Sequence, residues 1–159
     1  MERAGFEAID HTADVGLKVW AADLEELFLQ AARGLASLLT DPEGVTRDRE
    51  VDVGVSGADP EELLVAWLEE VLYLFEARGL LLVDFERPRI TGPTAEAKGG
   101  VKGGVEGDAE YRLTCRARGT AWNRGRHPLR SALKAATYHG LRLAPDAKGR
   151  YQTTIVFDT

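Results

Sequence analysis

The 159-residue sequence lacks paired cysteines, long apolar runs and a basic, apolar leader. Its single cysteine, Cys115, cannot form an internal disulfide, which is typical of a protein from a reducing compartment. No apolar run approaches the ~18–20 residues that a membrane-spanning helix needs. Residues 1–5 do not have the basic-then-apolar pattern of a secretory signal. We therefore expect a cytoplasmic protein.

Common catalytic and zinc-binding motifs are also missing. The three histidines, His11, His127 and His139, are scattered, and no His-Glu-x-x-His motif or cysteine pair accompanies them. The chain has neither a Gly-x-Ser-x-Gly elbow nor a phosphate-binding P-loop. Cys115 lies mid-strand among apolar neighbours, so we expect it to be a small buried residue. These absences disfavour zinc enzymes, serine hydrolases and P-loop nucleotidases.

The composition is that of a folded domain. Hydrophobic residues make up 44% of the chain and charged residues 29%, whereas a disordered chain has too few apolar side chains to offset its ordering entropy. At about 100–200 residues per domain, the length predicts one domain over residues 1–159. Residues 93–110 are rich in glycine and charge, and we expect them to form a flexible surface loop.

The charge is unevenly distributed along the chain. Residues 1–110 carry 10 Lys/Arg and 24 Asp/Glu, whereas residues 111–159 carry 10 and 2, which gives the net charge of −6. The basic part could meet RNA or an acidic protein. Alternatively, the two parts attract each other within one fold. We favour this second interpretation.

Two segments have helical periodicity together with start and stop signals. The first follows Asp23, with Glu26 three residues later as in a capping box. It ends before Pro42, because the residue that precedes a proline is pushed out of the α region. The second follows Asp59, has proline at its first position, and stops at Gly79.

Other segments alternate apolar and polar residues with the period of a β-strand. Residues 129–143 fit either a helix that ends at Gly140 or a strand. Two helices among six or more strands indicate an α+β fold, with both helices packed on a mostly antiparallel or mixed β-sheet. The expected strands are residues 6–9, 15–21, 51–55, 80–85, 89–91, 111–118 and 151–158.

Oxygen ligands are the most suggestive feature. Asp10 and Asp14 lie in a short polar connection between two expected strands, while Asp158 and the carboxylate of Thr159 end the chain. Ca²⁺ and Mg²⁺ prefer such oxygen donors. Alternatively, Asp14 caps a turn and the terminal carboxylate is solvated. Lys134 has apolar neighbours, so it either extends from a half-buried segment to solvent or provides a fixed cation for a phosphate or carboxylate.

Several motifs occur in an order that resembles the archease family. Together they extend over nearly the whole chain and are specific, although each alone is a weak signal. They are Asp10-His11-Thr12-Ala13-Asp14-Val15-Gly16, Leu24-Glu25-Glu26-Leu27-Phe28, Glu62-Leu63-Leu64 through Leu72-Tyr73-Leu74-Phe75, Lys134-Ala135-Ala136-Thr137-Tyr138-His139, and Ile155-Val156-Phe157-Asp158.

The resemblance implies an α+β fold related to the strand-helix-strand-strand module. It also implies an accessory protein rather than a free-standing enzyme. Archeases assist the RNA ligase RtcB, which joins 3′-phosphate or 2′,3′-cyclic-phosphate ends to 5′-hydroxyl ends. They promote guanylylation of the ligase from GTP and its multiple turnover, in tRNA splicing or RNA repair.

The resemblance further implies a divalent cation, calcium in the family, with magnesium or manganese as alternatives. Its ligands would be Asp14, Asp158 and Thr159. The functional lysine of the family corresponds to Lys134, and we assign to Lys134 and His11 contacts with the partner or a phosphate. The cation and Lys134 would orient a triphosphate or a ligase side chain for nucleotidyl transfer.

The chain departs from the family pattern in two places. Gly119-Thr120 stands where the family often has Gly-Glu, which puts a role for that acid in doubt. The glycine-rich insertion at residues 93–110 is longer than usual, and we assign it no function.

Two other functions compete with ligase activation. An RNA-binding chaperone would use the arginine-bearing strand face of Arg112, Arg116 and Arg118, and would bind RNA in a salt-dependent way. A small metal-dependent hydrolase is the least favoured hypothesis, because one oxygen-rich cation site comes with no clear general base.

Overall fold

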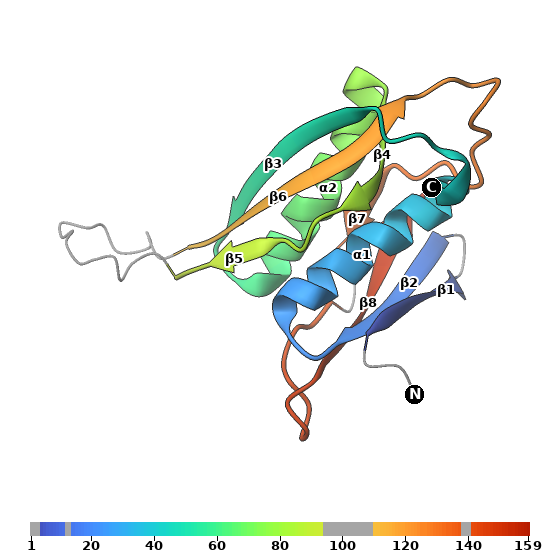
Figure 1. Cartoon of the computed structure of the whole chain (residues 1–159). Helices are drawn as coiled ribbons and strands as arrows, with labels where there is room; N and C mark the ends of the chain where they lie inside the picture. Colours follow the sequence, from blue (N-terminus) through green and yellow to red (C-terminus); the bar gives the residue numbers. More distant parts are fainter. Residues whose placement is uncertain (1–3, 12–13, 94–109, 138–140) are drawn as a thin grey trace.

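The computed structural model describes residues 4–11, 14–93, 110–137 and 141–159 (Figure 1). Most of the glycine-rich segment, residues 94–109, therefore lies outside the described residues. The elements are β1 (Gly5–His11), β2 (Asp14–Ala21), α1 (Leu24–Leu39), the 3₁₀ turn η1 (Pro42–Gly44), β3 (Arg49–Gly57), α2 (Pro60–Arg78), β4 (Leu80–Phe85), β5 (Arg89–Thr91), β6 (Tyr111–Ala121), β7 (Ala135–Thr137) and β8 (Tyr151–Asp158).

The strands form two four-stranded sheets. The first has the order β1-β2-β8-β7, and the second has the order β3-β6-β4, with β5 pairing with β6 as well. Every pairing between these strands is antiparallel. The prediction of an α+β fold with two helices on antiparallel strands is confirmed, but the strands divide between two sheets.

Both helices lie between the two sheets. Helix α1 packs on β1 and β2 of the first sheet and on β4 of the second, as Figure 1 shows. Eleven of its sixteen residues are buried, as expected of a helix covered on two sides. Helix α2 packs on β3, β4 and β6 and contacts β7. The core therefore holds side chains from all three layers.

The predicted helix signals are confirmed. The backbone N–H of Glu26 donates to Asp23 Oδ1 at 2.8 Å, and that of Glu62 donates to Asp59 Oδ1 at 2.8 Å. Gly79 ends α2 with a φ of +63°, the left-handed conformation that favours glycine. Local sequence thus determines where both helices begin and where α2 ends.

Residues 129–143 contain a short strand. The helical alternative is wrong for the described part, in which β7 is the only helix or strand. The Ala136 N–H donates to the Glu69 carboxylate at 2.6 Å, and the Leu143 N–H donates to Glu61 at 2.7 Å. The segment is therefore held by side chains of α2 and by β8, rather than by hydrogen bonds within a helix.

Trp67 joins three elements in the core. Its side chain is fully buried, and its Nε1–H donates to the carbonyl oxygen of Phe28 in α1 at 3.0 Å. Its ring meets Phe85 of β4 edge-on, with centroids 5.9 Å apart. This hydrogen bond satisfies the indole in an apolar environment and fixes α2 against α1.

Across the described residues, no helix is both long and apolar enough to span a lipid bilayer.

Candidate functional site

Strand pairing brings the predicted metal-binding residues to one end of the first sheet. His11, at the end of β1, is the register partner of Asp14, at the start of β2. In the next pair of strands Val15 lies opposite Phe157, so one further step of the antiparallel register places the Asp14 backbone opposite Asp158. Directly opposed residues of antiparallel strands have Cα atoms about 4.5–5.5 Å apart.

Lys134, the residue before β7, lies at the same end of the sheet. Its backbone N–H donates to the carbonyl oxygen of Asp158 at 2.9 Å, and the next residue, Ala135, is the register partner of Asp158. The side chains of Lys134, Asp158 and Thr159 are exposed. The lysine therefore lies at the surface beside the end of β8.

The predicted ligand set rests on this backbone arrangement. The side chains of residues 10–14, which include His11 and Asp14, lie outside the described residues. Among the described residues, no group of three or more His, Cys, Asp or Glu side chains is arranged to hold a metal ion.

Packing of β8 fixes where its carboxyl end lies. Ile155 and Phe157 are fully buried on the helix-facing side of the strand. Asp158 then leaves the apolar layer as the last residue of the strand and is exposed. The alternation that buries Phe157 thus places the Asp158 side chain at the surface, at the same end of the first sheet as the Asp14 backbone.

The donor types at this end of the sheet suit a hard cation. Asp14 and Asp158 have carboxylate oxygens, and Thr159 has hydroxyl and backbone oxygens, which are the ligands that Ca²⁺ and Mg²⁺ prefer. Two opposed carboxylates at this backbone separation would repel each other, and a bound divalent cation would relieve that repulsion. The residues present therefore fit an oxygen-ligated cation.

The arginines of β6 lie on the outer face of the second sheet and form ion pairs. Arg116 Nε is 3.1 Å from Asp52, and Arg118 lies 3.0 Å from Glu50 and 2.6 Å from Glu86. The hydrogen bond to Glu86 and the surrounding carboxylates raise the pKa of Arg118.

The third arginine of this strand, Arg112, lies 3.2 Å from the carboxylate of Glu110. Each arginine proposed for an RNA-binding face therefore pairs with an acid from residues 1–110. This geometry favours attraction within one fold over an RNA-binding face.

Cys115 lies on the opposite, helix-facing side of β6. It is buried, and its thiol donates to the carbonyl oxygen of Glu86 at 3.2 Å. Burial raises the pKa of the Cys115 thiol to about 12. The prediction of a buried residue is confirmed, and its thiol is a poor nucleophile at neutral pH.

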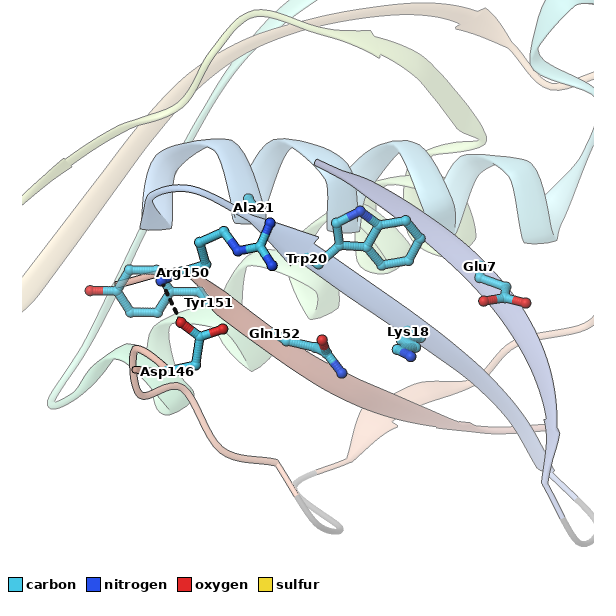
Figure 2. Close-up of a pocket in the computed structure, with 8 residues that line it drawn as sticks. All are labelled: Glu7, Lys18, Trp20, Ala21, Asp146, Arg150, Tyr151 and Gln152. Carbon is cyan, nitrogen blue, oxygen red and sulfur yellow. Dashed lines mark hydrogen bonds between the residues drawn. The ribbon is translucent and has the colours of Figure 1, made fainter. Parts of the chain in front are cut away.

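A cavity of about 200 Å³ lies on the first sheet, at the end remote from Asp158 (Figure 2). It carries both signs of charge and includes Trp20 of β2. Sequence reasoning missed it, and the only signal was Trp20 on the otherwise polar side of an alternating strand. The lining residues are Glu7, Lys18, Trp20, Ala21, Asp146, Arg150, Tyr151 and Gln152.

The chain is similar to known proteins over nearly its whole length. The model of the Archease protein family matches residues 6–159, which include both ends of the first sheet.

The chain belongs to the archease family.

Two curated archeases illustrate the relationship. The archease of Methanopyrus kandleri is 35% identical, over 96% of this chain and 98% of the relative. The archease of Pyrococcus furiosus is 31% identical, over 96% of this chain and 97% of the relative. The solution structure of Methanobacterium thermoautotrophicum protein 1598 has a TM-score of 0.72 and 28% identity, and covers 98% of this chain and 99% of that one. The archease similarity thus extends over the whole fold.

Within this archease fold, Gly119 and Thr120 lie where β6 pairs with β4. Thr120 is buried and is the register partner of Leu81, so this chain has a neutral polar side chain at the position where the family resemblance predicts an acid. A side chain at Gly119 would clash with the Leu81 carbonyl oxygen, so the close approach of the strands requires glycine.

Proposed function

We propose that this archease is a cytoplasmic accessory protein of an RtcB-type RNA ligase. It promotes GTP-dependent guanylylation of the ligase and its multiple turnover, and so supports joining of 3′-phosphate or 2′,3′-cyclic-phosphate ends to 5′-hydroxyl ends in tRNA splicing or RNA repair. It has no catalytic residues of its own. Family membership over residues 6–159 supports this proposal.

The proposed working part is the end of the first sheet. Asp14, Asp158 and Thr159 would hold a divalent cation, calcium, or magnesium or manganese in its place. Such a cation supplies positive charge that neutralises and orients phosphate oxygens. The observation that supports the proposal is the antiparallel register of β2 and β8, in which Val15 and Phe157 are partners and Asp14 and Asp158 are the next residues.

Lys134 and His11 are proposed to contact the partner or a phosphate beside this cation. The exposed Lys134 side chain leaves a backbone that β8 fixes through the hydrogen bond to the Asp158 carbonyl oxygen. Because the Lys134 backbone is fixed, its ammonium group stays within a limited distance of Asp158. Less conformational entropy is therefore lost when the lysine binds an anion. His11 is the register partner of Asp14 in the β1–β2 pair.

The test is guanylylation of the purified ligase from labelled GTP, with and without this protein. Wild type should stimulate the reaction, and Asp158→Asn should lose at least tenfold of the stimulation while keeping the fold. Asp146→Asn is the matched control, because Asp146 is an exposed carboxylate at the remote end of the sheet and asparagine retains the Oδ1 that accepts from Lys148 and Arg150. Undiminished stimulation by folded Asp158→Asn would contradict the proposed site, and no stimulation by wild type would contradict the function.

A further inference from the structure

A loop of unusual charge connects β6 to β7 at one end of the molecule (Figure 1). Arg124, Arg126, Leu129 and Arg130 are exposed there, and we call these four residues the basic loop. In the described part of the chain, none of its three arginines forms an ion pair with a carboxylate. The arginines of the neighbouring strand β6, in contrast, all do.

The sequence explains why the arginines of the basic loop form no ion pairs with acidic residues. From Tyr111 to Pro145 the chain has eight Lys/Arg and no Asp or Glu. Two arginines of β6 pair with carboxylates of the neighbouring strands β3 and β4. The chain leaves that sheet after Ala121, and the carboxylate beside the basic loop, Asp41, forms no ion pair with it among the described residues. A protein with a net charge of −6 therefore presents a local positive surface.

An apolar side chain lies among these arginines. Leu129 is 40% exposed and, with Tyr73, is one of two large hydrophobic residues exposed in the described part of the chain. Beside it is a hollow of about 270 Å³, whose lining includes Arg126, Leu129 and Arg130 together with Thr40, Asp41 and Val45. Arginine is enriched at protein–protein interfaces, and an exposed leucine among arginines provides apolar area that a partner can bury.

Hydrogen bonds hold residues 122–127, in the first half of the β6–β7 connection, in place. The buried His127 accepts the Asn123 N–H on Nδ1 at 2.9 Å, and its carbonyl oxygen accepts Trp122 Nε1–H at 2.9 Å. The side chain of Asn123 in turn accepts the N–H groups of Gly125 and Arg126 at 2.9 and 3.1 Å. A loop ordered in this way loses little entropy when a partner binds.

The second half of the loop is anchored to the end of α1. The Arg130 N–H donates to the Leu39 carbonyl oxygen at 2.7 Å, and its guanidinium donates to the Ser37 carbonyl oxygen at 3.1 Å. Four residues later, the Lys134 N–H donates to the carbonyl oxygen of Asp158. The basic loop therefore leads directly to the end of the first sheet that carries Asp158.

We propose that the basic loop docks on an acidic face of a protein partner, with Leu129 as the apolar anchor. The inference rests on the proposed function, in which that partner is the ligase, and it names the docking surface. Arginine is suited to carboxylate recognition, because its planar guanidinium donates hydrogen bonds to both carboxylate oxygens at once. Docking here would place the end of the first sheet against the same partner.

RNA is the less favoured ligand of this surface. Binding of single-stranded RNA generally uses aromatic rings that are free for base stacking. Trp122, the aromatic residue next to the basic loop, is half-buried, meets Phe75 edge-on with centroids 5.3 Å apart, and has Arg124 over its ring at 5.9 Å. The exposed residue at the centre of the loop is instead an aliphatic one, Leu129.

The experiment measures the dissociation constant of the ligase complex for Arg126→Glu and Leu129→Ser. Neither side chain makes a hydrogen bond or ion pair within the described chain, so both variants should keep the wild-type melting temperature. Each should weaken binding at least tenfold, and the effect of Arg126→Glu should shrink at high salt. Arg89→Glu is the control and should bind like wild type. Arg89 is an exposed residue of β5, which lies far from the β6–β7 loop in Figure 1.

The outcomes separate the two proposals. If wild type neither binds nor stimulates the ligase, the proposed function fails. If wild type does both and the two loop variants bind as tightly as wild type, the docking inference alone is overturned. Titration with polyuridylate provides the second arm: tight binding that Arg126→Glu abolishes, with ligase affinity unchanged, would assign the surface to RNA instead.

Discussion

Arginines of β6 and of the basic loop are neighbours in the chain but have opposite environments. Arg116 forms an ion pair with a carboxylate of β3, and Arg118 with carboxylates of β3 and β4. Arg126 and Arg130, in contrast, have no carboxylate partner among the described residues. The difference follows from register, because Asp52 is paired with Arg116 and Glu50 with Arg118. Cross-strand pairs of opposite charge stabilise a sheet. The same residue type thus serves the fold in one region and is available to a partner in the other.

The stability of the protein should be more sensitive to substitutions in the second sheet than to substitutions in the basic loop. Gly119→Ala should lower the free energy of unfolding by about 3 kcal/mol, because the added methyl group would clash with the Leu81 carbonyl oxygen. Gly54→Ala in β3 is the matched control, because its added Cβ would lie 3.8 Å from the Leu113 carbonyl oxygen. Urea denaturation of both variants measures the difference. Equal stability would mean that β4 and β6 do not approach as closely as described.

His127 tests whether the basic loop is ordered before a partner binds. His127→Phe leaves the Asn123 N–H without its acceptor and should cost about 1–2 kcal/mol of stability. It should also weaken ligase binding, since a loosened loop must be ordered again on docking. His127→Asn restores an acceptor near the Nδ1 position and should recover part of both effects. Unchanged urea denaturation and ligase affinity for His127→Phe would contradict a preformed loop.

The salt dependence of stability should distinguish arginines that form ion pairs from arginines that do not. Arg118→Ala should lower stability more at low than at high salt, because Glu50, Asp84 and Glu86 would repel one another without it. Arg126→Ala should leave stability unchanged at both salt concentrations. Thermal unfolding of the two variants at 20 mM and 500 mM sodium chloride makes the comparison. A similar loss for Arg126→Ala would mean that its charge also serves the fold.

Cys115 gives the smallest expected effect, on the face of β6 opposite the arginines. Burial raises the pKa of the Cys115 thiol to about 12, whereas the thiol of the unfolded chain has its ordinary pKa of 9.0. Between these two pH values the unfolded chain ionises and the folded protein keeps a neutral thiol. Its contribution to stability is complete below pH 9 and is lost as the pH rises towards 12. Cys115→Ala should therefore show a smaller loss of stability than wild type between pH 8 and pH 10. Rapid alkylation of the native thiol at pH 8 would contradict its burial.

The part of the fold that local sequence encodes could be predicted. Asp23 and Asp59 accept hydrogen bonds within the first turn of each helix, so the signal and the structure it forms are adjacent in the chain. β7 could not be predicted with confidence, because Glu69 and Asp158, which hold its backbone, are far away in sequence. The division into two sheets likewise depends on long-range register.

The candidate site was predictable only in part. Asp14, Asp158 and Thr159 came from the family resemblance, and the register of β2 and β8 supports their proximity at the backbone. The basic charge of residues 111–159 was visible in the sequence, but composition could not tell which arginines meet acids. The RNA hypothesis selected Arg116 and Arg118, whose positive charge is neutralised by register partners, and passed over Arg126.

Direct titration with a divalent cation tests the central claim, that the end of the first sheet holds an ion between Asp14 and Asp158. Calorimetry with Ca²⁺ and Mn²⁺ on the wild-type protein should show one site per chain. Asp14→Asn and Asp158→Asn should each remove it, while Asp146→Asn should retain it. A wild-type protein that binds no divalent cation, or an Asp158→Asn variant that binds it as tightly as wild type, would contradict the account.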